Sequence, residues 1–156
     1  YLFEAIQKVN EERCKKFLAM VLEHYKNNIK GKILTIWGAS FKAKTDDIRG
    51  APSIFIIEEL LKQGAQVRAF DPLAGSKLRE RFGKQIEVAS KQYPPLEGSE
   101  GLLVLTEWNE FRRPDYERMA QLMKEKVIFD GRNLYTPKTM VSYGFRYYSV
   151  GRPPVG

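Results

Sequence analysis

The sequence predicts an α/β fold: a doubly wound, mostly parallel, Rossmann-like sheet preceded by a long N-terminal helix. After Gly31, short apolar runs alternate with amphipathic segments of helical length, which is the order of parallel strands joined by helices. Right-handed crossovers then place helices on both faces of the sheet. The chain has 156 residues, of which 43% are hydrophobic. This is enough for one domain with a buried core.

The first element expected is one long helix over residues 3–28, where apolar residues recur at approximately helical spacing. Asn27, Asn28 and Gly31 end this pattern. The apolar stripe fits a connector between domains, a dimer surface or a helix that covers the sheet. The pattern alone leaves these alternatives open.

The elements after Gly31 are bounded by glycine, proline and polar turn residues. The expected strands cover residues 33–37, 66–70, 86–88, 102–105, 127–129 and 145–148. The expected helices cover residues 52–62, 76–82, 114–123 and 137–143. Pro52 suits the first turn of its helix, and residues 152–156 are expected to form a Pro-rich tail.

Composition argues against membrane and disulfide-rich classes. No apolar run approaches the roughly 20 residues that span a bilayer, and no signal peptide is visible, so we expect no membrane partner and a cytoplasmic location. Cys14 is the single cysteine, which excludes an internal disulfide and favours a reducing compartment. It lies in a charged helical stretch, and we interpret it as a bystander thiol. We expect no bound metal ion.

The net charge of +7 is compatible with a polyanionic partner. The basic residues are spread along the whole chain, however, and aromatic residues do not alternate with them. A phosphate-bearing small molecule explains local cations as well as a nucleic acid does. We therefore expect no nucleic-acid partner, and a nucleic-acid binder is the third hypothesis.

The loop after the first strand lacks the glycine pattern of a dinucleotide site. Such a site needs G-x-G-x-x-G, but after Gly38 the next glycine is Gly50. Asp71 ends the second strand, where a ribose-binding acid would lie, and we interpret it as a turn former helped by Pro72. A free-standing module that holds NAD itself is thus the second hypothesis.

Ligands of doubly wound sheets bind at the carboxyl ends of strands, so three loops matter. The first contains Lys42, Lys44 and Arg49, with Asp46 and Asp47 placed to hold the arginine guanidinium. A solvated charged loop and a ligand-binding loop are equally compatible with it. In an extended segment Lys42 and Lys44 cannot point the same way as Ala43, and one lysine can contact a ligand while the other is solvated.

The other two loops cover residues 106–111 and 130–133. Gly131 permits a tight turn, and Arg132 would then extend over the sheet edge, where a guanidinium suits a phosphate or a carboxylate. Trp108 and Phe111 are interpreted as packing residues.

These residues resemble the C-terminal domain of the UDP-glucose dehydrogenases over essentially the whole chain. The opening signature is Gly38-x-x-Phe41-Lys42-x-x-Thr45-Asp46-Asp47-x-Arg49-x-Ala51-Pro52-Ser53. Later landmarks in the same order are residues 69–72, 105–111, 130–133 and 148–152. Ala43 and Gly50 depart from the family pattern, which commonly has Pro and Glu there. The Thr-Asp-Asp spelling favours the UDP-glucose branch over UDP-N-acetyl-sugar enzymes, and GDP-mannose dehydrogenase has a similar spelling.

The resemblance implies that Phe41 and Lys42 contact the nucleotide sugar. It implies that Arg132 reaches the substrate of a partner subunit, and that Arg49 contacts NAD held in another domain. The family oxidises the sugar C6 alcohol to a carboxylate by two hydride transfers, through a thiohemiacetal on a catalytic cysteine.

Cys14 does not match the family's catalytic cysteine, so the resemblance implies no catalytic residue in this chain, which would be an excised and inactive fragment. Residues 1–30 would be the end of a central connecting or dimerisation helix. Residues 31–156 would be the nucleotide-sugar-binding domain of a homodimer or higher oligomer.

Overall fold

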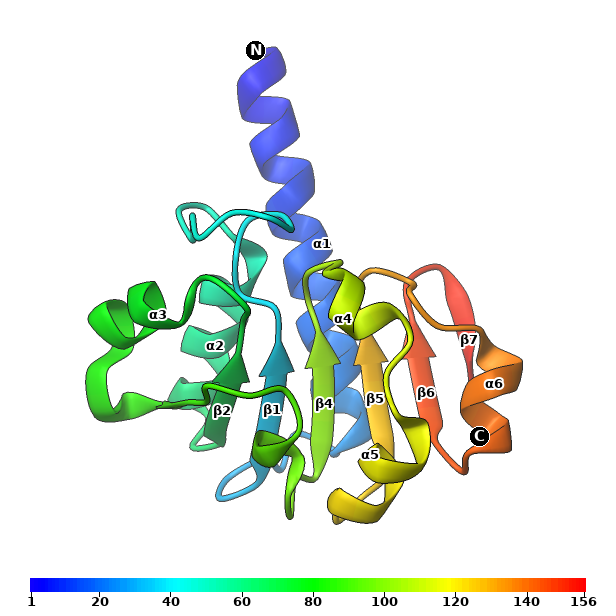
Figure 1. Ribbon diagram of the computed structural model, residues 1–156. Coiled ribbons are helices and arrows are strands. Elements are labelled where there is room, and N and C mark those ends of the chain that lie inside the picture. Colours follow the sequence, from blue (N-terminus) through cyan, green and yellow to red (C-terminus); the bar gives the residue numbers. More distant parts are fainter.

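A seven-stranded sheet forms the centre of the computed structural model, which describes residues 1–156 (Figure 1). Its strand order is β3-β2-β1-β4-β5-β6-β7. The strands are β1 (Ile33–Trp37), β2 (Gln66–Phe70), β3 (Glu87–Val88), β4 (Gly101–Val104), β5 (Val127–Asp130), β6 (Arg146–Ser149) and β7 (Arg152–Val155). The first six are parallel and β7 is antiparallel to β6. The predicted fold class is confirmed.

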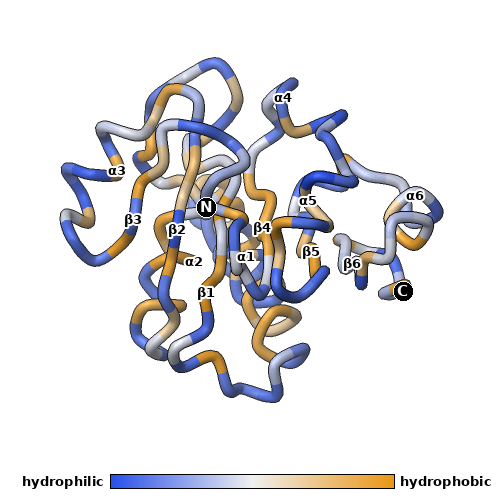
Figure 2. The backbone as a smooth tube through the Cα atoms, turned by 60° about the horizontal axis from the view of Figure 1, so that its bottom comes forward, coloured by the Kyte–Doolittle hydropathy of each residue, from blue (hydrophilic) through white to orange (hydrophobic).

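Helices cover both faces of the sheet. They are α1 (Leu2–His24), α2 (Pro52–Lys62), α3 (Gly75–Phe82), α4 (Asn109–Arg112), α5 (Tyr116–Leu122) and α6 (Pro137–Ser142), with 3₁₀ turns at Gly83–Gln85 and Pro94–Leu96. One core cluster joins α1, α2 and α3 to the sheet, and a second joins α4, α5 and α6 to it. The apolar segments of the chain gather in the central strands, and the loops are mostly polar (Figure 2).

The central strands are apolar because they are buried on both faces. All four residues of β4 and all four of β5 are buried, as expected for parallel strands between two helical layers. The chain after β1 crosses to α2 at Pro52, which occupies the first turn and needs no backbone donor there. The burial of the central strands and the position of Pro52 explain why the apolar runs and the proline predicted the central strands and the start of α2 closely.

Helix α1 has two different halves. Its C-terminal half packs on the sheet through Leu18 and Val21, whereas its N-terminal half projects beyond the carboxyl ends of the strands (Figure 1). The predicted end at residue 28 was wrong, because Lys26 and Asn27 adopt positive φ angles that terminate the helix after His24. No helix of the structure combines the length and apolar composition that a membrane crossing requires.

Two further predictions needed correction. The helix expected over residues 114–123 begins only at Tyr116, since Asp115 caps it by accepting a hydrogen bond from the Arg118 N–H, and a separate short α4 precedes it. The expected tail is strand β7, which pairs with β6 despite its two prolines. Proline is tolerated there because β7 is an edge strand.

A buried polar cluster fixes β5 to β6. The Tyr147 hydroxyl donates to Asp130 Oδ2 at 2.6 Å, and Arg152 Nη2 donates to the Tyr147 oxygen at 3.0 Å. The neighbouring Tyr135 side chain is also buried, but its hydroxyl has no hydrogen-bond partner. Burial raises the pKa of both phenols, so both remain protonated at neutral pH.

These two tyrosines give a matched test of the cluster. Tyr147→Phe is expected to lower the free energy of unfolding by about 1.5–3 kcal/mol, because a hydrogen bond to a carboxylate is lost. Tyr135→Phe removes a buried hydroxyl without a partner, so stability should stay unchanged or rise by up to about 1 kcal/mol. Urea denaturation measures both, and an equal loss for the two variants would contradict the assignment.

Candidate functional site

The switch point of the sheet lies between β1 and β4, and protein groups fill it. A Cβ added to Gly38 would lie 2.5 Å from Thr106 Cβ, so the loops after these strands are in direct contact. The Thr106 hydroxyl donates to the Ser40 carbonyl at 3.0 Å. Protein contacts thus occupy the position after β1 where a glycine turn would cradle pyrophosphate, in agreement with the missing glycine pattern.

Asp71 holds this closed edge together. The side chain is buried, and its Oδ2 accepts hydrogen bonds from the backbone N–H groups of Ala39 and Ser40 at 2.8 and 3.0 Å. The same oxygen accepts from the Ser40 hydroxyl and the Trp108 indole N–H. Oδ1 accepts from the backbone of Leu73 and Ala74. The predicted turn role of Asp71 is confirmed, and the carboxylate also anchors two other loops.

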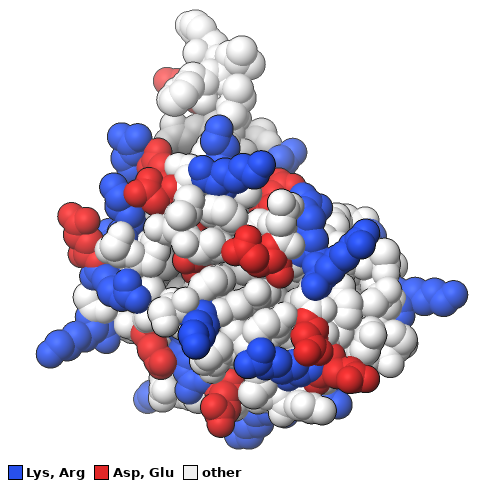
Figure 3. Space-filling model, viewed as in Figure 1, with Lys and Arg blue, Asp and Glu red and all other residues white.

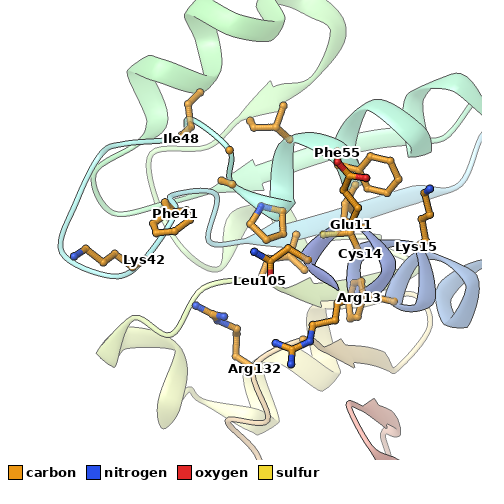
Figure 4. A pocket seen from close by; sticks show the side chains of 18 of the residues that line it. Glu11, Arg13, Cys14, Lys15, Phe41, Lys42, Ile48, Phe55, Leu105 and Arg132 are labelled. Atoms are coloured by element: carbon orange, nitrogen blue, oxygen red, sulfur yellow. The ribbon is translucent and has the colours of Figure 1, made fainter. Parts of the chain in front are cut away.

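An open hollow of about 1880 Å³ lies beside the closed edge, between the projecting half of α1 and the loops at the carboxyl ends of the strands. Its lining includes Phe41, Lys42, Arg49 and Arg132. The four site residues predicted from sequence are thus brought to one concave surface. Phe41 and Lys42 lie across this hollow from Arg132 (Figure 4).

Phe41 and Lys42 are presented by a short loop that closes on itself. The Phe41 N–H donates to the Asp47 carbonyl at 2.7 Å, and the Phe41 residue is 54% exposed. An exposed aromatic ring beside a cation suits a ligand with a flat or apolar face next to an anionic group. Lys42 forms no ion pair within the chain, and Lys44, at a positive φ, does not line the hollow.

Arg49 is paired with Asp47 through two hydrogen bonds. Its Nε donates to Oδ1 and its Nη2 to Oδ2, both at 3.0 Å. These bonds lower the pKa of the Asp47 carboxyl to about 2. The expected pairing therefore forms with Asp47, and Asp46 takes no part in it. The guanidinium is 90% exposed, so a ligand can reach it from solvent.

Arg132 follows β5 on a rigidly held loop. Its N–H donates to Asp130 Oδ1 at 3.0 Å, and Asn133 exchanges two hydrogen bonds with the Val150 backbone. A Cβ at Gly131 would lie 3.4 Å from the Phe17 ring of α1 and 3.1 Å from a β4 carbonyl. The absence of a side chain at Gly131 thus allows α1 to approach this loop closely, a role in addition to the tight turn that we expected.

Trp108 and Phe111 are buried, as their interpretation as packing residues required. The Phe111 ring stacks on Trp37 with centroids 5.2 Å apart. Neither residue lines the hollow. Their function is to fix the loop after β4.

Helix α1 forms one wall of the hollow, and this was not predicted from the sequence. Arg13, Cys14 and Phe17 line it, and their helical spacing indicated a shared face without showing that this face lies above the sheet edge. Burial raises the pKa of the Cys14 thiol, so the thiol stays protonated near neutral pH and is a poor nucleophile.

Charges of both signs are mixed on the face seen in Figure 3, with basic side chains around the loops at the carboxyl edge. This face carries no continuous basic stripe of the kind that follows a nucleic-acid backbone. The hollow instead brings single cations together, which suits a small anionic ligand.

Residues 35–137 match the family model described as the UDP-glucose/GDP-mannose dehydrogenase family, UDP binding domain. The chain is 34% identical over 160 residues to the UDP-glucose 6-dehydrogenase of Pseudomonas aeruginosa, covering 99% of this chain and 35% of that protein. It is also 34% identical over 154 residues to UDP-glucose 6-dehydrogenase TuaD of Bacillus subtilis, covering 99% and 33%.

Among solved structures, a UDP-glucose dehydrogenase from the archaeon Pyrobaculum islandicum superposes with a TM-score of 0.78 at 27% identity. The match covers 96% of this chain and 32% of that one. The chain spans about a third of the length of the curated relatives it matches.

The role of Asp71 can be tested by removing its charge alone. In Asp71→Asn the amide nitrogen would face backbone donors, so we expect a loss of about 2–4 kcal/mol in the free energy of unfolding. Asp46→Asn makes the same chemical change at an exposed residue without hydrogen-bond partners and is expected to change stability by less than about 0.5 kcal/mol. Similar unfolding midpoints in urea for the two variants would disprove this role.

Proposed function

The chain belongs to the UDP-glucose/GDP-mannose dehydrogenase family as its UDP-binding domain, and from this premise we propose that it binds the nucleotide sugar of an NAD-dependent UDP-glucose 6-dehydrogenase. The observation that carries the proposal is the meeting of Phe41, Lys42 and Arg132 at one hollow. Because Lys42 and Arg132 of one chain line the same hollow, we assign both to the diphosphate bound there, in place of the partner subunit's substrate that the resemblance implies for Arg132. The exposed ring contacts the uridine or sugar.

NAD and the chemistry belong to the remainder of the enzyme in this proposal. The Asp71 network fills the place where a dinucleotide fold holds pyrophosphate, which supports a binding role for this sheet without NAD. Arg49, exposed at the mouth of the hollow, is positioned to contact NAD held in another domain. The full enzyme then converts UDP-glucose to UDP-glucuronate by two hydride transfers.

We assign residues 1–30 to a connecting or dimerisation helix. The N-terminal half of α1 exposes Leu2, Phe3, Ile6 and Val9, and such a run of apolar side chains favours burial against another domain or subunit. Residues 31–156 form the substrate-binding domain of a homodimer or higher oligomer.

The assignment of the sugar and base rests on two supports. The Thr45-Asp46-Asp47 spelling favours the UDP-glucose branch, and the first relatives carry that name. UDP-N-acetyl sugars and GDP-mannose are the alternatives. Calorimetric titration of the full-length enzyme with the three nucleotide sugars separates them, and preferential binding of GDP-mannose would overturn the base assignment.

Lys42 is the sharpest test of the site. Lys42→Ala in the full-length protein is expected to weaken UDP-glucose binding by about 1.5–3 kcal/mol, or roughly 10- to 150-fold in Kd, because a charge-assisted contact is lost. Lys44→Ala removes the same charge two residues away, outside the hollow, and should change Kd less than about threefold. Equal Kd values for wild type and Lys42→Ala would reject Lys42 as a contact.

A further inference from the structure

Glu107 connects Arg112 to Arg132, the arginine that lines the hollow. Its Oε2 accepts a hydrogen bond from Arg112 Nη2 at 3.3 Å, and its Oε1 lies 3.4 Å from Arg132 Nη2. The contact with Arg112 has hydrogen-bond geometry, whereas the contact with Arg132 is an ion pair without it. Arg112 therefore holds the carboxylate, and Arg132 is attracted to it electrostatically.

The backbone of Arg132 is fixed while its guanidinium is only loosely held. Asp130 accepts its N–H, and Asn133 binds the adjacent loop to Val150. The side chain makes no hydrogen bond within the chain and is 33% exposed. Its guanidinium donors thus remain available to another acceptor, at a position that lines the hollow.

A diphosphate is a better acceptor for this guanidinium than Glu107. It carries more negative charge and offers paired oxygens that match the planar fork of arginine. Glu107 is 47% exposed, and an ion pair this exposed contributes little stability. Exchange of one partner for the other is therefore favourable.

We propose that Glu107 is a displaceable counter-charge for Arg132. It holds the guanidinium beside the hollow before a nucleotide binds and releases it to the diphosphate of the bound nucleotide, a role that rests on the proposed function. Glu107 is thus a positioning residue that acts through Arg132. It lowers affinity, because its pair with Arg132 has to break and its charge repels the incoming phosphates. Arg112 keeps the carboxylate paired after Arg132 leaves.

The test is calorimetric titration of the full-length protein with UDP. Glu107→Gln is expected to lower the Kd about two- to tenfold, since it removes the competing charge but keeps the side-chain shape. Glu110→Gln makes the same change three residues along the chain, in the short helix α4 that follows Glu107, at an exposed residue without an ion pair. Its Kd should shift less than twofold, roughly the size of a general charge effect.

A double-mutant cycle separates this mechanism from a general effect on charge or folding. With Arg132→Gln as the background, Glu107→Gln should no longer tighten UDP binding. An unchanged or higher Kd for the single variant, or tightening that persists without Arg132, would overturn the proposal. Wild-type protein that fails to bind UDP would instead refute the proposed function itself, so the two failures are distinguishable.

Discussion

The buried carboxylate of Asp71 is the constraint on which the carboxyl edge of the sheet depends. A charge removed from water is tolerable only when hydrogen bonds replace its hydration, and here six donors do so. They come from the loop after β1, the turn after β2 and Trp108 after β4. One side chain therefore fixes three loops relative to one another, including the stem from which Phe41 and Lys42 project.

This constraint also separates the chain from a dinucleotide-binding sheet of the same topology. In such sheets an acid at the end of the second strand binds a ribose, and a glycine turn cradles pyrophosphate at the switch point. Here the carboxylate of Asp71 accepts its hydrogen bonds from protein donors, and Gly38 allows the close contact with Thr106. In the proposed site the ligand-facing groups lie further out, at the hollow under α1. The same strand order thus supports a different binding surface.

Sequence periodicity was sufficient for most of the sheet, because buried parallel strands are continuous apolar runs and proline marks where α2 begins. Periodicity failed where local backbone conformation or long-range pairing determines whether a segment is a helix or a strand. The positive φ angles of Lys26 and Asn27 end α1 early, and β7 becomes a strand only through its pairing with β6. The turn formed by Asp71 is local and could be predicted from the sequence. Its hydrogen bonds to Ala39 and Trp108 span more than 30 residues and could not be predicted in this way. Placement of Arg132 followed from parallel topology, whereas its pairing with Glu107 did not.

The cations of the hollow differ in what a ligand has to displace. Lys42 has no carboxylate partner, so it contributes its charge to any anion that enters. Arg49 and Arg132 are held by Asp47 and Glu107, and a ligand gains them only if it is a stronger acceptor than a carboxylate. A single carboxylate ligand offers no such advantage, whereas a diphosphate does. In the proposed site, partner exchange at the arginines is therefore a physical basis for selecting phosphate over other anions, and Lys42 attracts both kinds of ligand.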